Sequence, residues 1–508
     1  MKTALNAFFL LAVAASIFFA SWFVQHNNLY FYGDLARDFL LFEEIVMTKK
    51  PVLIGPRTSM QGVFHGPAWL YLNVPAFVIG EGDPVAVGWF WVALAATSMG
   101  ILYFASSKLV SKQSALPITA LFALAIAGSV SSLYNPFGAV LFSPLFFLFF
   151  VRYMQKQKIV DLLLALFCVG MSIQFEMVWG VPILFLASIL ILYAIIKHKK
   201  FIHLLSFAVL SLPLSTFILF DLRHQFIQLK GILRYVSPGG AKEQVDYLAL
   251  LTTRAKDMLL ALSSYFSNGN TYLAMAFTGI FILLVLLFFT SKAKKKFPKN
   301  PLVGYFLYFY IGFWILTLPL KGIVYEYYYW AFLPLFCIAI GSLFEYQFKK
   351  YSTLLFVPLV LFLIITNSQI IKKQDAKFFK NNTALWSFYN GQAQSIFRNA
   401  EEEFGWFVYT ADQYAYPFKY AMSYAAQVYP ETRSYKFQKK PVTYLMIYPS
   451  DNKYTNEKWW REGQLKITKQ PRSISKSIGG SYIEKYYFSV QDAGVPVDSS
   501  LLDDLTFR

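Results

Sequence analysis

Eleven apolar runs constrain what this chain of 508 residues can fold into. Each run is close to the length that an α-helix needs to cross a bilayer, about 20 residues. The chain is 56% hydrophobic and 15% charged, which is more apolar than an ordinary soluble domain. The sequence therefore predicts a polytopic α-helical membrane protein with about eleven transmembrane helices. With boundaries good to a few residues, the expected spans are 4–24, 85–106, 114–131, 136–151, 159–174, 178–196, 201–220, 271–291, 301–320, 327–345 and 352–370.

The first apolar run follows Lys2 and has two interpretations. A short apolar run after a basic residue is typical of a signal peptide. This run is longer than the apolar part of a typical signal peptide, and Trp22 lies where an interfacial anchor would lie. We therefore expect a retained first helix. Under either interpretation the residues that follow it lie outside the membrane.

The net charge of +18 follows the expected topology. If the N-terminus is cytoplasmic, the short outer loops near 132–135, 175–177 and 321–326 hold one basic residue, Lys321. The short inner loops hold Lys108, Lys112, Arg152, Lys156, Lys158, Lys197, Lys199, Lys200, Lys292, Lys294, Lys295, Lys296, Lys299, Lys349 and Lys350. This asymmetry is the positive-inside pattern of a multi-pass protein of the cytoplasmic membrane. Because no base-reading motif accompanies the charge, we expect membrane lipids as partners and no nucleic acid.

The sequence divides into two predicted domains. Residues 1–370 form a transmembrane domain with long outer loops at 25–84 and 221–270. An odd number of spans places the tail, 371–508, outside the cytoplasm as a soluble α/β domain. Alternating residues predict strands in VTYLMIYP (442–449) and SYIEKYYFSV (481–490). NAEEEFG (399–405) followed by WFVYTAD (406–412) predicts a helix and then a strand.

Few residues in the sequence suggest a metal or nucleotide site. The two cysteines, Cys168 and Cys337, lie in apolar runs and are expected to be buried small hydrophobes. The chain has no zinc-ligand spacing, no P-loop and no dinucleotide fingerprint. The chemistry must therefore come from other polar residues in the outer segments.

An acidic stretch, YGDLARDFLLFEEIV (32–46), follows the first span directly. We expect a helix that starts near Asp34 and lies at the membrane surface with one apolar stripe. Asp34 and Asp38 are four residues apart and share a face, with Arg37 beside them. Asp34 can be the helix N-cap, with Arg37 and Asp38 a solvated pair. Asp34 and Asp38 can also be catalytic carboxylates. The two interpretations are compatible, because a capping carboxylate still accepts a proton.

This arrangement resembles the C-type (GT-C) integral-membrane glycosyltransferases. The shared features are an outward acid after the first span, a long first outer loop, many spans and an outer tail. The nearer likeness is to the protein O-mannosyltransferase and aminoarabinose (lipid A) transferase branch. In that family an Asp at the start of the first outer loop is essential, and Asp34 matches its position. The family often continues with Glu, whereas Leu35 follows here and the second acid is Asp38.

The resemblance continues along residues 1–370. Phe64-His65-Gly66-Pro67 is similar to the family's Phe-x-x-Pro element, with Gly66 where the aminoarabinose branch carries Lys. Some C-type enzymes have a second essential acid in a later outer loop, and the nearby acid here is Glu176. Three further segments resemble the family: YNPFGAV (134–140), FDLRH (220–224) and YEYYYWAFLP (325–334).

The resemblance implies a sugar donor carried on a polyprenyl phosphate. Its phosphate needs cations, and Arg provides bidentate donors. DLRHQFIQLKGILRY (221–235) is expected to form an amphipathic helix, which can instead anchor the loop to anionic headgroups. His65 can orient the donor or hold a divalent cation together with an acid. The expected donor-binding residues are Arg37, Arg57, His65, Arg223, His224, Lys230 and Arg234.

The sequence thus predicts a glycosyltransferase that acts at the outer face of the cytoplasmic membrane. It would move the sugar to a lipid, glycan or protein acceptor, and direct attack would invert the anomeric carbon. One alternative is a lipid-linked glycan flippase or transporter, which would want charge or broken helices along a pathway through the membrane. Another is a glycan ligase or polymerase, which would act on diphosphate-linked donors.

Overall fold

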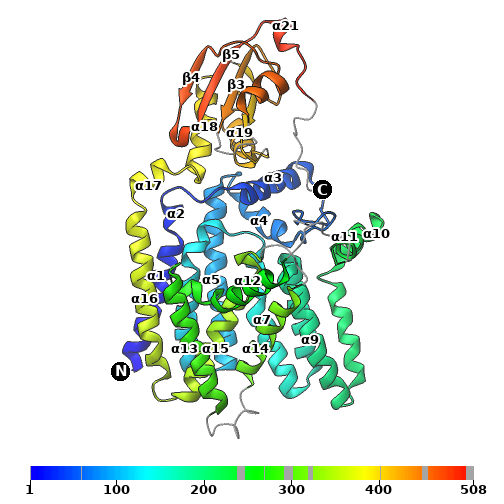
Figure 1. Cartoon of the computed structure of the whole chain (residues 1–508), viewed down its shortest axis with the longest axis vertical. Helices are drawn as coiled ribbons and strands as arrows, with labels where there is room; N and C mark the ends of the chain where they lie inside the picture. The colour runs from blue at the N-terminus through cyan, green and yellow to red at the C-terminus, as the bar shows by residue number, and fades with distance from the viewer. Residues whose placement is uncertain are drawn as a thin grey trace. The chain divides into compact units, whose positions relative to one another are not determined.

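The computed structural model describes residues 2–58, 60–236, 246–267, 269–290, 301–318, 324–400, 402–412, 414–448 and 456–498 (Figure 1). The basic residues expected in the inner loop at 292–299, and Lys321, lie outside these ranges. The chain forms two compact units. The first comprises residues 1–21, 51–72 and 90–371, and the second comprises 22–50, 73–89 and 372–508. The expected division at 370 stays a prediction.

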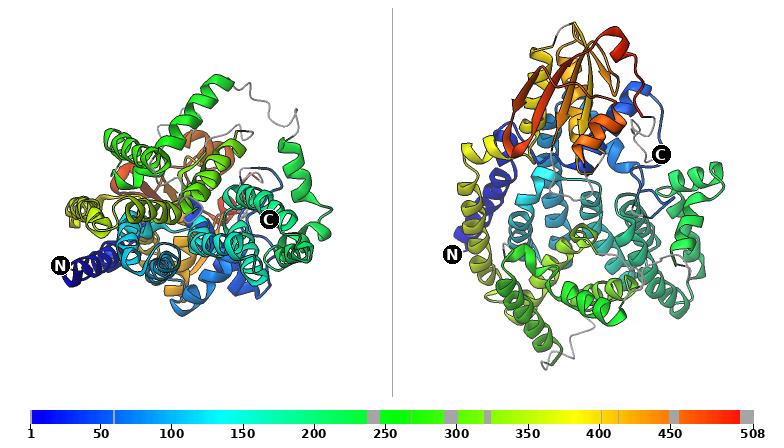
Figure 2. Two further views of the ribbon diagram at one scale, coloured as in Figure 1. Left: turned by 90° about the horizontal axis from the view of Figure 1, so that it is seen from below. Right: turned by 45° about the horizontal axis from the view of Figure 1, so that its top comes forward.

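The first unit is helical, and many of its helices are seen nearly end-on in Figure 2, left. Three helices have residues in both sequence ranges: α4 (Ala68–Ile79), α5 (Pro84–Leu109) and α16 (Ser352–Lys373). Four short 3-10 helices join it: η1 (Ala127–Ser132), η2 (Phe201–Ser211), η3 (Ser263–Phe266) and η5 (Glu326–Tyr329). Its other helices are α1 (Lys2–Ala20), α6 (Lys112–Ile126), α7 (Pro136–Lys156), α8 (Ile159–Phe175), α9 (Met177–Lys197), α10 (Ser215–Arg223), α11 (Ile227–Val236), α12 (Tyr247–Leu260), α13 (Thr271–Thr290), α14 (Leu302–Leu316) and α15 (Phe332–Gln347).

Every expected span coincides with a helix or with two successive helices. Within the described residues, seven helices are long and apolar enough to cross a membrane, and η2 with α10, bent by 65°, makes an eighth. The spans expected at 159–174, 301–320 and 327–345 correspond to the shorter apolar helices α8, α14 and α15. The polytopic helical membrane fold is therefore confirmed. Sequence analysis did not count α4, a further short apolar helix.

The core of the first unit lies around α6. This helix packs on α1 and α15, while α7 packs on α8. Of the apolar window of α6, 78% is buried in protein, against 11% for α13. Exposed apolar side chains on a helix of this length suit contact with lipid. The burial therefore separates a central helix from a peripheral one.

The second unit contains a five-stranded sheet in the order β2-β1-β3-β5-β4 (Figure 2, right). Its strands are β1 (Glu403–Tyr409), β2 (Arg433–Lys436), β3 (Val442–Ile447), β4 (Ser473–Lys476) and β5 (Tyr482–Tyr487). Strand β1 runs parallel to β2 and β3, and β5 runs antiparallel to β3 and β4. Its helices are α2 (Trp22–Gln25), α3 (Gly33–Thr48), α17 (Ala376–Asn381), α18 (Trp386–Arg398), α19 (Tyr416–Val428), α20 (Glu457–Trp459) and α21 (Val490–Ala493), with η6 (Trp460–Gln464) and η7 (Ile478–Gly480).

The α/β character of the tail is confirmed, with one local error. The strands predicted at 442–449 and 481–490 correspond to β3 and β5. The helix predicted at 399–405 is wrong, because α18 ends at Arg398 and β1 already begins at Glu403. Glu402 lies in the connection before the strand, and Glu403 is the first residue of β1. Helix preference of three consecutive acids does not outweigh the pairing of β1 between two strands.

Segments far apart in sequence complete the core of the second unit. Helix α3 packs against α19, and the rings of Phe39 and Tyr420 lie 5.2 Å apart. Tyr420 is fully buried, and its hydroxyl donates to the carbonyl oxygen of Gly82. The N–H of Phe31 donates to the carbonyl of Ala384 at 2.8 Å. The helix that carries the acidic stretch is therefore part of the same compact unit as the tail.

Candidate functional site

Helix α3 positions the acidic residues, and its first turn corrects the capping interpretation. The N-cap residue is Tyr32, which makes no side-chain cap hydrogen bond. Asp34 lies inside the helix, in its first turn, where a carboxylate interacts favourably with the helix dipole. The interpretation of Asp34 as the N-cap is therefore wrong. Its carboxylate is engaged by a side chain instead of a backbone N–H.

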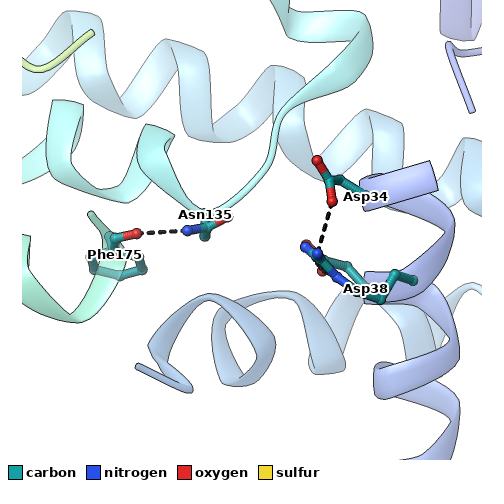
Figure 3. A network of polar contacts seen from close by, with 5 residues as sticks. Asp34, Asp38, Asn135 and Phe175 are labelled. Atoms are coloured by element: carbon teal, nitrogen blue, oxygen red, sulfur yellow. Dashed lines mark hydrogen bonds and ion pairs between the residues drawn. The ribbon is translucent and has the colours of Figure 1, made fainter. Parts of the chain in front are cut away.

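Arg37 bridges the two aspartates. Its Nη1 lies 2.8 Å from Asp34 Oδ1, and its Nη2 lies 3.1 Å from Asp38 Oδ1. Figure 3 shows the Asp34 carboxylate in this ion pair, with Asp38 one turn further along α3. The side chain of Asp34 is 54% exposed, whereas those of Arg37 and Asp38 are 13% and 3% exposed. The structure thus holds an accessible carboxylate on a buried ion pair.

The two neighbouring carboxylates stabilise the charged form of Arg37. Burial lowers the pKa of Arg37, but Asp38 and then Asp34 raise it, so that its pKa is above the usual value. Arg37 is therefore a permanent cation that orients both carboxylates. Since its guanidinium already serves two acids, the arrangement gives it a positioning role. A direct role of Arg37 in donor binding stays a prediction.

The surroundings of α3 differ from those of a helix lying on a membrane surface. Nine of its 16 residues are buried, and they include Leu40, Leu41 and Glu43 as well as the apolar residues Leu35, Phe39 and Phe42. Burial raises the pKa of Glu43, against hydrogen bonds from Ser423 and Gln427. The helix is therefore enclosed by protein over most of its surface. The one-sided amphipathic helix expected from the sequence is wrong.

A hairpin-like loop carries Arg57 and His65 in the first unit. Arg57 pairs with Phe64 as an antiparallel bridge, and the Gly55 N–H donates to the His65 carbonyl at 2.8 Å. The chain reverses at Gly62, whose φ of +80° lies in the region that favours glycine. Arg57 is exposed and His65 is half-buried. The turn therefore presents a guanidinium from a backbone held by hydrogen bonds.

This loop packs on α10 and α11. The Phe64 ring meets Phe220 edge-on at 5.6 Å, and the Phe64 N–H donates to Gln228 Oε1 at 3.1 Å. The Asp221 carboxylate accepts from the N–H groups of Gln228 and Leu229, at 2.9 and 3.1 Å. The structure thus brings together the elements that carry Arg57 and His65 and those that carry the cations of 221–235.

Residues 221–235 do not form one continuous helix. Helix α10 ends at Arg223 and α11 begins at Ile227, because Gln225 and Phe226 adopt φ values of 55° and 59°. The single helix expected over this stretch is therefore wrong. The cations Arg223, His224, Lys230 and Arg234 are all exposed. Large apolar side chains lie exposed among them, such as Leu222 and Leu233, as in helices that lie on a membrane surface.

Gly66 packs closely against the buried side chain of Gln174, near the end of α8. The Gly66 N–H donates to the Gln174 carbonyl at 3.0 Å, and a Cβ on Gly66 would lie 2.0 Å from Gln174 Oε1. Asn135 Nδ2 donates to the Phe175 carbonyl at 2.8 Å (Figure 3). There is consequently no room for the Lys that the aminoarabinose branch carries at this position.

Glu176 follows directly and is buried. Its Oε1 accepts from the Val178 N–H at 3.0 Å and so caps α9. In the described part of the chain, its Oε2 has no hydrogen-bond partner. Burial raises the pKa of Glu176 to about 8, against the hydrogen bond from Val178, which lowers it. Glu176 is therefore mostly protonated at neutral pH.

Sequence analysis missed a further group of polar residues in the first unit. Arg254 on α12 is buried, which is rare for an arginine. Burial raises the pKa of Tyr265 well above its usual value, and the neighbouring Glu326 raises it further. The available sequence signal was the spacing of Arg254 and Asp257, three apart on one helix face. That spacing also occurs on ordinary solvated helices.

The residues that the structure describes do not form a metal site. Across the described ranges, no three His, Cys, Asp or Glu side chains converge as ligands. A divalent cation held by His65 and acids therefore does not fit the donor set, and no step below depends on one.

The solved structures that are similar to this chain identify its fold. It is the fold of the C-type (GT-C) integral-membrane glycosyltransferases, and the resemblance seen in the sequence is confirmed. In particular, the chain is similar to ArnT from Cupriavidus metallidurans, an aminoarabinose transferase. The apo structure matches with a TM-score of 0.57 at 10% identity, over 95% of this chain and 98% of that chain. ArnT bound to undecaprenyl phosphate matches with a TM-score of 0.50 at 12% identity, over 97% and 100%.

A third solved structure is less similar. It is the oligosaccharyltransferase of Archaeoglobus fulgidus in complex with Zn and sulfate. It matches with a TM-score of 0.42 at 10% identity, over 83% of this chain and 62% of that chain. No protein-family model matches the chain, and no curated protein matches it.

Proposed function

We propose that this protein is a membrane glycosyltransferase that uses a polyprenyl-phosphate sugar as donor. It transfers the sugar to a lipid, glycan or protein acceptor at the outer face of the cytoplasmic membrane, with inversion. The observation that carries the proposal is the accessible Asp34 carboxylate, fixed by Arg37 at 2.8 Å in the first segment after the first span. A general base needs both access to the substrate and a fixed orientation.

The similar structures support the class of donor. ArnT has been solved with undecaprenyl phosphate, and its fold extends over 97% of this chain. A polyprenyl phosphate lies in the membrane with its phosphate at the surface. The exposed cations of the Arg57 loop, α10 and α11 alternate with exposed apolar residues, and both kinds of side chain suit such a ligand.

The proposed reaction is a single displacement. Asp34 accepts the proton of the acceptor hydroxyl while that oxygen attacks the anomeric carbon. The bond between this carbon and the phosphate oxygen breaks, and the polyprenyl phosphate leaves with the electron pair. Attack opposite the leaving group inverts the anomeric centre. Arg37 and Asp38, on the same helix as Asp34, hold its carboxylate in place.

Two alternatives belong to other classes. A flippase or transporter needs charge or broken helices along a membrane pathway. The described spans include one bent pair, η2 with α10 at 65°. Their ion pair between Arg152 and Asp161, at 3.0 Å, lies within a turn or two of two helix ends. A ligase or polymerase would use diphosphate-linked donors. An assay that offers monophosphate and diphosphate donors separately therefore distinguishes this alternative from the proposed function.

The test is a transfer assay in membranes that contain the full chain. Polyprenyl monophosphate sugars, polyprenyl diphosphate sugars and nucleotide sugars are offered separately, and the glycosylated product is identified by mass spectrometry. We expect transfer from the monophosphate donors. Asp34→Asn removes the proton acceptor and keeps the size, so that activity should fall at least about a hundredfold. Asp375→Asn is the matched control, because Asp375 is an exposed N-cap of α17 and Asn also caps.

Two results would reject this function. The first is a requirement for a nucleotide-sugar donor. The second is an Asp34→Asn protein whose activity stays within a few-fold of the Asp375→Asn control, which would leave Asp38 as the acid to test.

A further inference from the structure

The first unit contains a basic pocket, and none of the candidate site residues lines it. It has a volume of about 400 Å³ and opens where α5 and α7 end and α14 begins. This volume is within the range of small-molecule sites, roughly 300–1,000 Å³. Its lining includes Lys108, Leu109, Arg152, Gln155, Lys156 and Leu302.

The charge of this pocket is positive. Three cations line it, and Arg152 pairs with the buried carboxylate of Asp161 at 3.0 Å. Lys108 and Lys156 are exposed. Lysines also gather at helix C-termini and on cytoplasmic loops for general electrostatic reasons. These general effects do not explain why the lysines line a pocket. Here Lys108, Lys156 and Arg152 line the same pocket.

The backbone around the pocket is firmly held. Gln157 ends α7 with a φ of 52°, and its N–H donates to the Tyr153 carbonyl at 2.8 Å. Lys200 Nζ donates to the Gln157 carbonyl at 3.0 Å. Asp161 belongs to the first turn of α8 and fixes the guanidinium of Arg152. The pocket is therefore lined by an arginine oriented by its ion pair and by two long lysine side chains. Apolar Leu302 and Val151 lie beside them.

We propose that this pocket binds an anionic phosphate group. The guanidinium supplies directional donors, the lysines supply charge, and the apolar lining accepts the carbon chain next to a phosphodiester. The inference does not depend on the glycosyl transfer proposed above. The phosphate can belong to the headgroup of an anionic lipid or to a free phosphate compound. The loops that form the pocket are those expected on the cytoplasmic side.

The test compares two double variants of the full-length protein. Lys108→Gln with Lys156→Gln removes two charges from the pocket, while Arg152 and its buried partner stay intact. Lys112→Gln with Lys158→Gln removes two exposed charges from the same two loops outside the pocket. Binding is measured by native mass spectrometry and by thermal stabilisation. The lipid probe is phosphatidylglycerol, with phosphatidylcholine as the neutral comparison, and the soluble probes are inorganic phosphate and pyrophosphate.

We expect the pocket variant to bind the phosphate-bearing probe about 25-fold more weakly than the wild type does, because each lysine contributes about fivefold to the affinity. The control variant should stay within about threefold of the wild type. Loss confined to phosphatidylglycerol assigns the site to a lipid headgroup, and loss confined to the soluble probes assigns it to a free phosphate compound. Equal binding by both variants, equal loss in both, or no binding of any probe by the wild type would overturn the proposal.

Discussion

Asp34 and Glu176 are acids with different surroundings. The side chain of Asp34 is 54% exposed and is paired with Arg37. Glu176 is buried beside apolar residues, with one oxygen on a helix N-terminus. An acid that stays protonated can donate a hydrogen bond but cannot be a base at neutral pH. The proton acceptor is therefore sought at Asp34.

We predict that Glu176 makes stability fall as pH rises. Its pKa is about 8 when folded and about 4.3 in an unfolded chain, so the folded state binds more protons between these values. Stability therefore declines from about pH 4.3 to about pH 8 and then levels off. Glu176→Gln removes this decline. Its melting temperature in detergent should match the wild type below about pH 4, where the unfolded side chain is also protonated, and exceed it at pH 8.

Glu431→Gln is the control for this titration, because Glu431 is an exposed acid. Its melting temperature should follow the wild type at every pH. A Glu176→Gln protein whose difference from the wild type is the same at pH 5 and pH 8 would contradict the raised pKa.

At the residue scale, the acids and cations could be found from the sequence, but their burial and their positions in the helix could not. The spacing of Asp34 and Asp38 predicted a shared face, and Arg37 does bridge them. The N-cap was misplaced by two residues, because Tyr32 ends the extended segment and leaves Asp34 inside the helix. Acids favour both the cap and the first turn, so that residue type alone does not separate these positions.

At the scale of elements, the contact between the 55–66 loop and the end of α8 gives a prediction for Gly66. A Cβ there would meet Gln174 Oε1 at 2.0 Å and the Gln174 carbonyl oxygen at 2.8 Å. Gly66→Ala should lower the free energy of unfolding by roughly 1–3 kcal/mol, since a well-packed site resists an added methyl. Gly66→Lys should cost more and should not improve donor binding.

Gly33→Ala is the control, because nothing lies within 4 Å of a Cβ at that position. Thermal unfolding in detergent measures both variants. A Gly66→Ala protein as stable as Gly33→Ala would show that the loop moves away from Gln174 at little cost.

The cations of the Arg57 loop, α10 and α11 give a second prediction at this scale. A charge-assisted contact to phosphate contributes roughly 1.5–3 kcal/mol. Arg57→Ala, Arg223→Ala and Arg234→Ala should therefore weaken donor binding about ten- to a hundredfold. Neutral nanodiscs are needed, because an effect through anionic headgroups disappears in them. Lys256→Ala, an exposed cation on α12, is the control. Unchanged donor affinity in all three arginine variants would reject this phosphate site.

The elements differ in how well they could be predicted. The spans follow from apolar length, which depends on local sequence, and each coincides with helical structure. The break between α10 and α11 had no such signal. Gln225 and Phe226 adopt positive φ without glycine or proline nearby, a conformation that costs about 1–2 kcal/mol per residue. The bonds from Gln228 and Leu229 to Asp221 offset that cost. Hydrophobic periodicity does not reveal hydrogen bonds of this kind between a side chain and backbone N–H groups seven and eight residues away.

For the whole molecule, the prediction concerns topology. The tail should lie outside the cytoplasm, because the basic residues concentrate in alternate loops and the number of expected spans is odd. A reporter that is active only outside the cytoplasm, fused after residue 508, should be active. The same reporter fused after Lys200, in an inner loop, should be inactive. Activity at Lys200 and none at 508 would overturn the topology and the assignment of Asp34 to an outer segment.

The grouping of sequence segments could not be predicted at this scale. Residues 22–50 and 73–89 join the tail through contacts such as Phe39 with Tyr420 and the bridge between Tyr30 and Leu385. These pairs are separated by more than 300 positions, and hydrophobic periodicity says that a residue is buried without saying by what. The candidate base thus belongs to a helix whose packing partners are encoded near the other end of the gene.

That arrangement has a consequence during synthesis. Residues 22–50 and 73–89 are made early, but Tyr420 and Leu385 emerge after the intervening 90–371 have been translated. At ~5–20 residues per second, this delay is roughly 15–60 s. During it, Phe39 of α3 lacks the ring of Tyr420, which lies 5.2 Å from it in the finished protein. Premature termination after residue 236 and before the tail would therefore leave a nascent chain that contains every proposed reacting group and no completed support for Asp34.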